Sequence, residues 1–231
     1  MNSFKKYLFL FSALSMLLYL NSCIGDDIIF DTVAETVIIK NPIDSLGFGT
    51  SYQFEAVFNN NVGQQETRSI LWQSSDSSII GITINGLATG HQTGMAIITA
   101  TAAETASMAK ASIPVIVGEN TTATATDRMG VLKTTSSYTL EGSFVLKEEG
   151  DKLVLTLNED YLASSNLPGL YLYLTNNPNT TNGAFEVGAV SVFSGTHSYT
   201  LPDDIELNSY NYLLYFCKPF RVKVGDGKFD E

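Results

Sequence analysis

The side chains of this sequence with the most distinctive chemistry are its two cysteines, Cys23 near the start and Cys217 near the end. A thiol can carry a lipid, bind a metal, form a disulfide or act as a nucleophile when it is ionised. The two histidines, His91 and His197, have no cysteine or carboxylate at the spacing of a zinc site. No phosphate-binding loop, dinucleotide fingerprint or Gly-x-Ser-x-Gly motif occurs either. The sequence therefore predicts no metal and no cofactor, and the functional question falls on the cysteines.

Cys23 follows a segment with the features of an export signal. Lys5 and Lys6 precede an apolar run over residues 7–20, and the run ends in Leu-Asn-Ser-Cys. An apolar run this short, with positive charge only upstream, is typical of a signal peptide and not of a spanning helix. The ending resembles the lipobox of bacterial lipoproteins. This resemblance implies that residues 1–22 are a removed signal peptide and that the Cys23 thiol takes a diacylglycerol with acyl chains such as palmitate. The alternative is an ordinary leader with an incidental cysteine.

Residues 23–33 are predicted to form a lipidated tether. Asp26 and Asp27 follow shortly after Cys23, and such an acidic cluster resembles the surface-export signal of lipoproteins in some Gram-negative lineages. A plain solvated tether would look similar. The expected location is the bacterial cell envelope, with the chain lipid-anchored to the outer membrane, either on the cell surface or on the periplasmic leaflet.

The charge of the chain restricts its partners. Without the leader, which contains Lys5 and Lys6 and no acid, 24 acidic residues face 11 basic ones, for a net charge of −13. No basic stripe is present that could neutralise phosphates, so nucleic acid is not an expected partner. An acidic surface also repels anionic lipid, so attachment to the membrane must come through the lipid on Cys23. Lipidation then leaves Cys217 without a partner in the chain, in a compartment that favours oxidation.

The first half of the exported chain has the pattern of β-strands throughout. Apolar and polar residues alternate over residues 52–58, and Ile80, Ile82 and Ile84 are expected on one face of another strand. Asn-Gly at 85–86 predicts a hairpin turn, because both turn positions tolerate a positive φ. About seven short strands with turns at regular spacing indicate a small Greek-key sandwich.

Three segments of this half resemble group-2 bacterial immunoglobulin-like domains. They read WQSSD from Trp72, ITINGLATG from Ile82 and GMAIITA from Gly94. The resemblance covers residues 34–117 and implies an immunoglobulin-like sandwich of the kind that serves as a spacer, an adhesion module or a carbohydrate-associated module on bacterial surfaces. Trp72 lies in an alternating strand, so it is expected in the core and not as a sugar-stacking platform.

Residues 118–126 are polar and rich in Thr and Ala, which predicts a linker. A second domain is then expected over residues 127–231, either an antiparallel β-sandwich or a barrel-like sheet, so that the whole exported chain is all-β. The expected strands of this domain are 138–146, 153–157, 170–175, 185–190, 199–200, 212–217 and 221–224.

Four segments of the second half together resemble the DM-thirteen domain. They are LEGSF (140–144), LPGLYLYL (167–174), the stretch 195–202 and the terminal segment YNYLLYFCKPFRVKVGDGKF (210–229). The resemblance implies electron transfer or redox chemistry, with Cys217 as the active group. One departure concerns a histidine that the family often carries before its first strand, where this chain has Ser-Ser-Tyr at 136–138. Haem ligation through a local His–Cys pair therefore has no support.

The residues around Cys217 allow two interpretations. Leu213, Tyr215 and Cys217 fall on one side of a strand that is apolar on both sides, which predicts a central strand and an inert, buried thiol. Against this, a neighbouring cation would stabilise a reactive thiolate. The bases nearby in sequence are Lys218, Arg221, Lys223 and Lys228. Strand alternation and a turn at Pro219 are expected to direct the nearest of them away from the thiol.

The predicted function is that of an envelope- or surface-anchored binding or interaction module, with the immunoglobulin-like half as a stalk. Its partner would be an unidentified protein or glycan. The alternative, from a different class, is a redox or electron-transfer domain that works through the free thiol of Cys217. No catalytic constellation is present in the sequence, so an enzymatic activity is not favoured.

Overall fold

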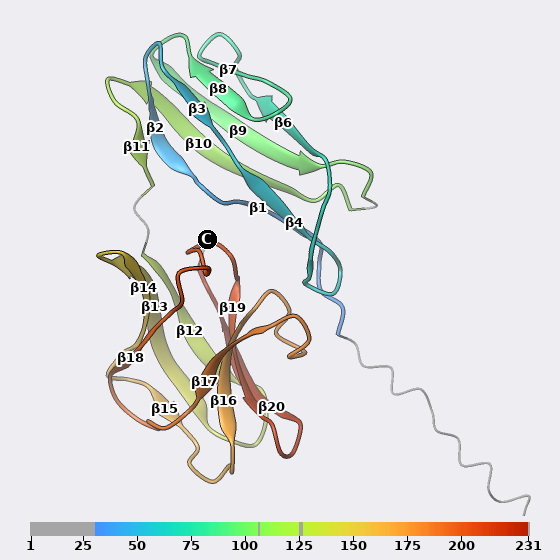
Figure 1. Ribbon diagram of the computed structural model, residues 1–231, viewed down its shortest axis with the longest axis vertical. Coiled ribbons are helices and arrows are strands. Elements are labelled where there is room, and N and C mark those ends of the chain that lie inside the picture. Colours follow the sequence, from blue (N-terminus) through green and yellow to red (C-terminus); the bar gives the residue numbers. More distant parts are fainter. Residues whose placement is uncertain (1–30, 106, 125–126, 231) are drawn as a thin grey trace, which may run out of the picture. The chain divides into compact units, whose positions relative to one another are not determined.

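The computed structural model describes residues 31–105, 107–124 and 127–230 (Figure 1). Within these ranges all the regular elements are β-strands, so the all-β prediction is confirmed for the described part of the chain. The same ranges contain no helix with the length and apolarity that a membrane crossing requires. The predicted signal peptide, Cys23 and the tether up to residue 30 lie outside the described residues.

The first half is built from three sheets. Its strands are β1 (Thr36–Ile39), β2 (Ile43–Gly47), β3 (Ser51–Gln53), β4 (Ala56–Asn59), β5 (Gln65–Glu66), β6 (Ile70–Ser74), β7 (Ile80–Ile82), β8 (Leu87–Gly90), β9 (Gly94–Ala102), β10 (Lys110–Gly118) and β11 (Thr122–Ala123). One sheet has the order β11-β2-β10-β9-β6, and the two smaller ones have the orders β1-β4-β5 and β3-β8-β7. The strands β2 and β10 pair in parallel.

One hydrophobic core joins these three sheets. Along β9, Ala96, Ile98 and Ala100 are buried and the residues between them face outward, as the period of a half-buried strand requires. Trp72 of β6 is 9% exposed, and its ring stacks on that of Phe54 with 5.7 Å between the ring centroids. The prediction that Trp72 is a core residue is confirmed.

The strand pattern after β6 differs from the prediction in one place. Ile80 is fully buried, but Ile84 is 77% exposed, so the expected common face of the three isoleucines is wrong. The strand β7 ends at Ile82, and the chain then turns through Gly86, which has a φ of 84°. The hairpin at Asn-Gly was predicted correctly, and it begins before Ile84, which removes that residue from the ladder.

The segment predicted as a linker contains regular structure. Gly118 is the last residue of β10, and Thr122 pairs with Ser45 of β2. The Ser45 hydroxyl also hydrogen-bonds the Thr122 hydroxyl at 2.6 Å. The sheet of the first half therefore continues as far as Ala123. Its polar, Thr-rich sequence did not indicate this, because an edge strand of two exposed residues needs no apolar face.

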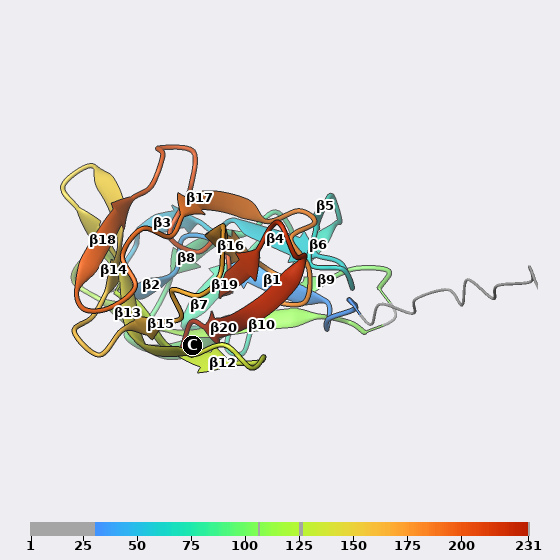
Figure 2. The ribbon, with the colours of Figure 1, turned by 90° about the horizontal axis from the view of Figure 1, so that it is seen from below.

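The second half forms one nine-stranded sheet. Its strands are β12 (Arg128–Thr134), β13 (Leu140–Glu149), β14 (Lys152–Leu157), β15 (Leu162–Ala163), β16 (Leu170–Thr175), β17 (Phe185–Ala189), β18 (His197–Thr200), β19 (Tyr212–Cys217) and β20 (Val222–Lys228). The order is β17-β16-β19-β20-β12-β13-β14-β18, with β15 paired to β13. Seen end-on in Figure 2, these strands follow one another around a central core. The sheet is nearly closed, which is the barrel-like form of the two that the sequence allowed.

The strand β12 was missed by the sequence analysis. Leu132 faces the core, but Met129 and Val131 face outward and are 50% and 56% exposed. Apolar residues on both sides of the strand remove the alternation by which a half-buried strand is detected. The pairing of β12 with both β13 and β20 is what connects the two parts of the sheet.

Glycines allow β12 and β20 to pass close to the ring of Phe144 in this core. A Cβ atom added to Gly130 would lie 2.2 Å from the carbonyl oxygen of Lys228 and 2.5 Å from Cζ of Phe144. A Cβ added to Gly227 would lie 2.5 Å from the same ring. Both contacts are too short for real Cβ atoms, so this crossing accepts only glycine.

We expect Gly130→Ala to lower the free energy of unfolding by about 3 kcal/mol, because the methyl group meets backbone that cannot move aside. The matched control is Gly118→Ala, where an added Cβ has no atom within 4 Å. This control is expected to change stability by less than about 1 kcal/mol. Urea unfolding of the chain without its predicted signal peptide measures both, and equal losses in the two variants would contradict the packing argument.

Candidate functional site

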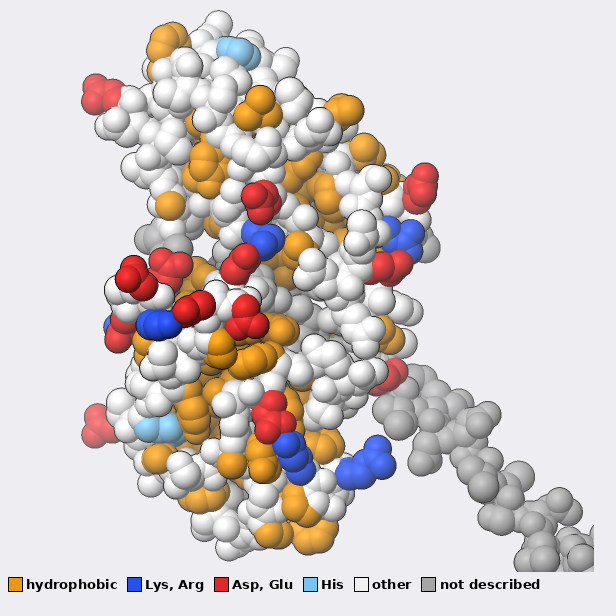
Figure 3. Space-filling model, in the orientation of Figure 1, with side chains coloured by type: hydrophobic (Ala, Val, Ile, Leu, Met, Phe, Trp, Pro, Cys, Tyr) orange, Lys and Arg blue, Asp and Glu red, His pale blue; other side chains and the backbone are white. Residues whose placement is uncertain are grey.

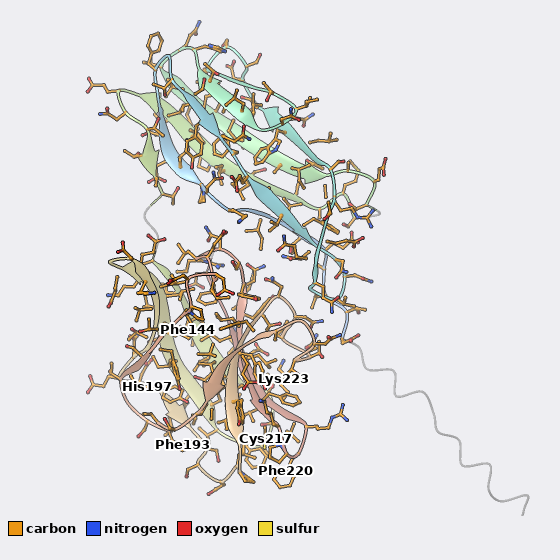
Figure 4. All side chains as sticks on the ribbon, in the orientation of Figure 1. Phe144, Phe193, His197, Cys217, Phe220 and Lys223 are labelled. Carbon is orange, nitrogen blue, oxygen red and sulfur yellow. The ribbon has the colours of Figure 1, made fainter. Side chains whose placement is uncertain are left out.

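Cys217 is the last residue of β19, which lies between β16 and β20. Its side chain is 0% exposed and belongs to the hydrophobic core of the second half, within which Figure 4 places it. Leu170 and Val222 are its cross-strand neighbours. The thiol donates a weak hydrogen bond to the carbonyl oxygen of Pro168, with 3.6 Å between the atoms. The geometry is that of a packed core cysteine.

The basic residues near Cys217 in sequence do not share its side of the sheet. Lys223 is the cross-strand neighbour of Phe216, and both side chains point outward. Lys218 lies over the ring of Tyr171, which is also an outward residue. Alternation was expected to direct these cations away from the thiol, and the positions of Lys218 and Lys223 agree with it.

The outer face of β16, β19 and β20 carries aromatic and charged side chains in rows that run across the strands. The pairing register makes Tyr171, Phe216 and Lys223 one row. The next row consists of Tyr173, Leu214 and Asp226. Since neighbouring strands lie about 4.8 Å apart, a side chain stands at that repeat along each row. Figure 3 shows hydrophobic side chains on the visible side of the second half, with acidic and basic ones beside them.

The hairpin between β19 and β20 follows directly on the first of these rows, and its residue Lys218 contacts the Tyr171 ring of that row. We name this row and hairpin together the aromatic–basic face. Its members are Tyr171, Phe216, Lys218, Phe220, Arg221 and Lys223.

Lys218 connects the charged and aromatic parts of the face. Its ammonium lies 2.5 Å from a carboxylate oxygen of Glu186 and 3.8 Å from the centroid of the Tyr171 ring. The hydrogen bond with Glu186 raises the pKa of the Lys218 ammonium. An ammonium above a ring centroid means that the Tyr171 ring presents its π face, and not its edge, to the outside of the sheet.

The partly buried ion pair of Lys223 and Asp226 supports the same surface from β20. Their side chains are only 23% and 19% exposed. Leu214, the cross-strand neighbour of Asp226, is 0% exposed although it points away from the core. Burial also raises the pKa of Tyr173, with Glu186 adding to this effect. At Leu214 the outward side of β19 is thus covered by its own neighbours, and these side chains have little freedom.

The tip of the hairpin exposes one aromatic ring and one cation. Phe220 is 61% exposed, and Figure 4 places it at the end of the second half. Arg221 is exposed, has a φ of 53°, and donates its backbone N–H to the carbonyl oxygen of Lys218. A left-handed conformation at a residue other than glycine is held only where surrounding structure requires it. The turn therefore holds Phe220 and Arg221 in a defined arrangement.

A second group of polar side chains lies inside the barrel-like sheet. The rings of Tyr161 and His197 are 4.8 Å apart between centroids, and those of Tyr161 and Tyr215 are 6.1 Å apart. The Nδ1 atom of His197 donates to the carbonyl oxygen of Gly195 at 2.9 Å, which directs the other ring nitrogen inward. Among the described residues the Tyr161 and Tyr215 hydroxyls and His197 Nε2 make no hydrogen bond of ordinary geometry.

Burial dominates the acid–base behaviour of these tyrosines. It raises the pKa of Tyr161 to about 12, although the nearby Tyr215 hydroxyl partly offsets the effect. Burial raises the pKa of Tyr215 well above its ordinary value, and Tyr161 adds to that shift. The two hydroxyls are thus close enough to influence each other, even though their geometry is poor for a hydrogen bond. Both phenols are neutral at physiological pH.

The sequence pattern did not indicate this group, and the strand expected at residues 199–200 did not include His197. His197 is in fact the first residue of β18, paired with Leu157. Tyr161, His197 and Tyr215 are far apart in the chain, and no local motif connects them. The near closure of the sheet is what brings them together.

Cys23 lies outside the described residues, so its lipidation stays a prediction. His91 is exposed in the first half, whereas His197 belongs to the second. Within the described ranges, no three His, Cys, Asp or Glu residues gather as metal ligands would. The expectation of no metal and no cofactor is not tested by this arrangement.

Comparisons with known proteins identify no family for this chain. No family model matches the chain, and no curated protein matches it. The resemblances to lipoproteins and to the DM-thirteen domain therefore receive no support from a family match. Among solved structures, the chain is similar to an intimin mutant from EHEC O157:H7, at 12% identity and a TM-score of 0.27. The alignment covers 47% of this chain and 53% of that one, so it spans about half of either.

Burial of Cys217 predicts slow chemistry at its thiol. In the chain from residue 24 onward, we expect a disulfide reagent such as DTNB to label native Cys217 at least about a hundredfold more slowly than the unfolded chain, because labelling requires opening of the core. Adding Ser191→Cys supplies an exposed thiol as control. A native rate equal to that of the control thiol would show that Cys217 is accessible.

The raised tyrosine pKa values predict a loss of stability in alkali. The pKa of Tyr161 is about 12 in the folded chain and about 10 in the unfolded chain. The contribution of this group to the free energy of unfolding is therefore complete below pH 10 and is lost as the pH rises towards 12. The expected loss is at most about 2 kcal/mol. Tyr161→Phe cannot ionise and should lose less between pH 9 and 12, as measured by urea unfolding. The control is Tyr138→Phe, and the same alkaline loss in both variants would contradict this account.

Proposed function

We propose that this protein is a binding module of the bacterial cell envelope, anchored by lipid on Cys23. In this proposal the first half is a stalk and the aromatic–basic face of the second half is the binding surface. The export segment and the Leu-Asn-Ser-Cys ending motivate the anchor. The single observation that carries the binding role is the face itself, because ordered aromatic rings and cations on an outer strand surface are the side chains that recognise partners.

The alternative redox function receives less support from the geometry. A thiol that exchanges electrons or disulfides must meet its partner as an accessible thiolate. Cys217 is 0% exposed, and its hydrogen is bonded to the carbonyl oxygen of Pro168. A redox role would require the core around β19 to open in every cycle. The slow labelling predicted above therefore bears on the function as well as on the packing.

The anchor has a direct test in cells. We expect the wild-type chain to incorporate labelled palmitate and to sediment with membranes. Cys23→Ala should lose both properties, because it removes the thiol that would carry the lipid. Cys217→Ala removes the other cysteine and is the matched control, which should keep both. Palmitate incorporation by Cys23→Ala would disprove the assignment.

The binding role is tested on arrays of glycans and of envelope proteins, with the whole exported chain as the reagent. We expect at least one class of ligand to be retained by the wild-type chain and to be lost in Arg221→Ala with Tyr171→Ala. The control carries Lys147→Ala and Lys152→Ala, which also change exposed side chains of the second half. Absence of any retained ligand, or equal loss in the control, would contradict a binding function of this face.

A further inference from the structure

The charge at the aromatic–basic face has the opposite sign to the charge of the molecule. Three of its six members, Lys218, Arg221 and Lys223, are cations, and the two lysines pair with Glu186 and Asp226. Lys133 of β12 is the cross-strand neighbour of Asp226 and adds a fourth cation. The surface is thus locally positive on a chain with a net charge of −11. Such a contrast favours an anionic ligand and steers it to this place.

Two of these cations are available to a ligand without breaking an ion pair. Lys218 and Lys223 pair with Glu186 and Asp226, whereas Arg221 and Lys133 take part in no ion pair among the described residues. Both side chains are exposed. A guanidinium with five donors in a planar fork is suited to a carboxylate or a sulfate, which it can bind through two parallel hydrogen bonds.

The aromatic part of the face has the dimensions of a sugar chain. Tyr171 and Phe216 stand next to each other across two strands, and Lys223 follows on the third. Their repeat of about 4.8 Å is close to the length of one hexose unit. The Tyr171 ring presents its π face outward, where the Lys218 ammonium now lies at 3.8 Å. The apolar C–H side of a sugar ring can take this position as Lys218 turns to a ligand carboxylate.

From this combination we infer that the aromatic–basic face binds an acidic polysaccharide, whose units carry carboxylate or sulfate groups. The inference rests on the proposed binding function and specifies its ligand class. Tyr171 and Phe216 contact the sugar rings. Arg221, Lys218, Lys223 and Lys133 bind the acidic groups. An anionic membrane would need several protruding apolar side chains at one site, and on this face Phe220 alone protrudes to that degree.

The test uses the whole exported chain and polygalacturonate as the acidic polysaccharide, with dextran as its neutral counterpart. Calorimetry at low and at moderate salt should show binding to polygalacturonate that weakens as salt rises, and no binding to dextran. We expect Arg221→Ala to weaken binding about tenfold, as the loss of a charge-assisted hydrogen bond implies. Tyr171→Ala should weaken it by a similar factor, whereas Tyr171→Phe, which keeps the ring, should bind like the wild-type chain.

Two double variants distinguish binding at the aromatic–basic face from non-specific attraction by positive charge. Lys218→Ala with Lys223→Ala removes two ion-paired lysines from the face, and Lys147→Ala with Lys152→Ala removes two ion-paired lysines from elsewhere in the same half. Only the first pair should reduce binding. Equal reduction by both pairs, or no binding to polygalacturonate, would overturn the inference. Equal or tighter binding to polyglutamate or to phosphatidylglycerol vesicles would also overturn it, by assigning the face to an acidic protein or a membrane.

The outcomes also separate this inference from the proposed function. If the arrays return a protein or a neutral glycan that requires Arg221 and Tyr171, the face binds a partner but the acidic polysaccharide is wrong. If the arrays return no ligand that depends on the face, and polygalacturonate does not bind, both proposals fail. Circular dichroism and thermal unfolding of each variant confirm that a loss of binding is not a loss of fold.

Discussion

Burial of β19 on both of its sides is the constraint on which the second half depends. Leu213, Tyr215 and Cys217 point into the barrel-like core and are all 0% exposed. Leu214 points the other way and is equally buried. A strand in the middle of a nearly closed sheet must satisfy both conditions, because its inner side fills the core and its outer side is covered by long side chains of the adjacent strands.

This double burial determines what the thiol and the surface can do. A sulfur atom in the inner layer is packed by β16 and β20 and is hydrogen-bonded to the Pro168 carbonyl, so its place is set by packing. The outward apolar side chains of β19 must be shielded from water. The ion pairs of Lys218 with Glu186 and of Lys223 with Asp226 provide part of this shielding. Ion pairs that solvent reaches, such as that of Lys218 with Glu186, contribute little to stability, typically below about 1 kcal/mol. Their larger effect here is positional, because they hold aromatic and cationic side chains in fixed rows.

The buried polar atoms of Tyr161, Tyr215 and His197 inside the same sheet lower the stability of the fold. A buried hydroxyl without a good partner costs about 1–3 kcal/mol relative to a paired one. Tyr161 and Tyr215 place two such hydroxyls beside His197, whose orientation is set by the Gly195 carbonyl. Their ring contacts offset part of that cost, since aromatic pairs at these centroid distances are favourable. The group restricts how the core packs, as polar residues in an apolar interior often do.

The sequence by itself determined the all-β class, the central position of β19 and the core position of Trp72, because each follows from the pattern of apolar residues within a few consecutive positions. It also contains the linear pattern that predicts an export segment ending at Cys23, which lies outside the described residues. The strand β12 escaped detection because Met129 and Val131 are apolar on its outer side. The aromatic–basic face and the Tyr161–His197–Tyr215 group were decided only by the tertiary structure. Their members come from strands that are distant in the chain, and only pairing register and near closure of the sheet bring such residues together.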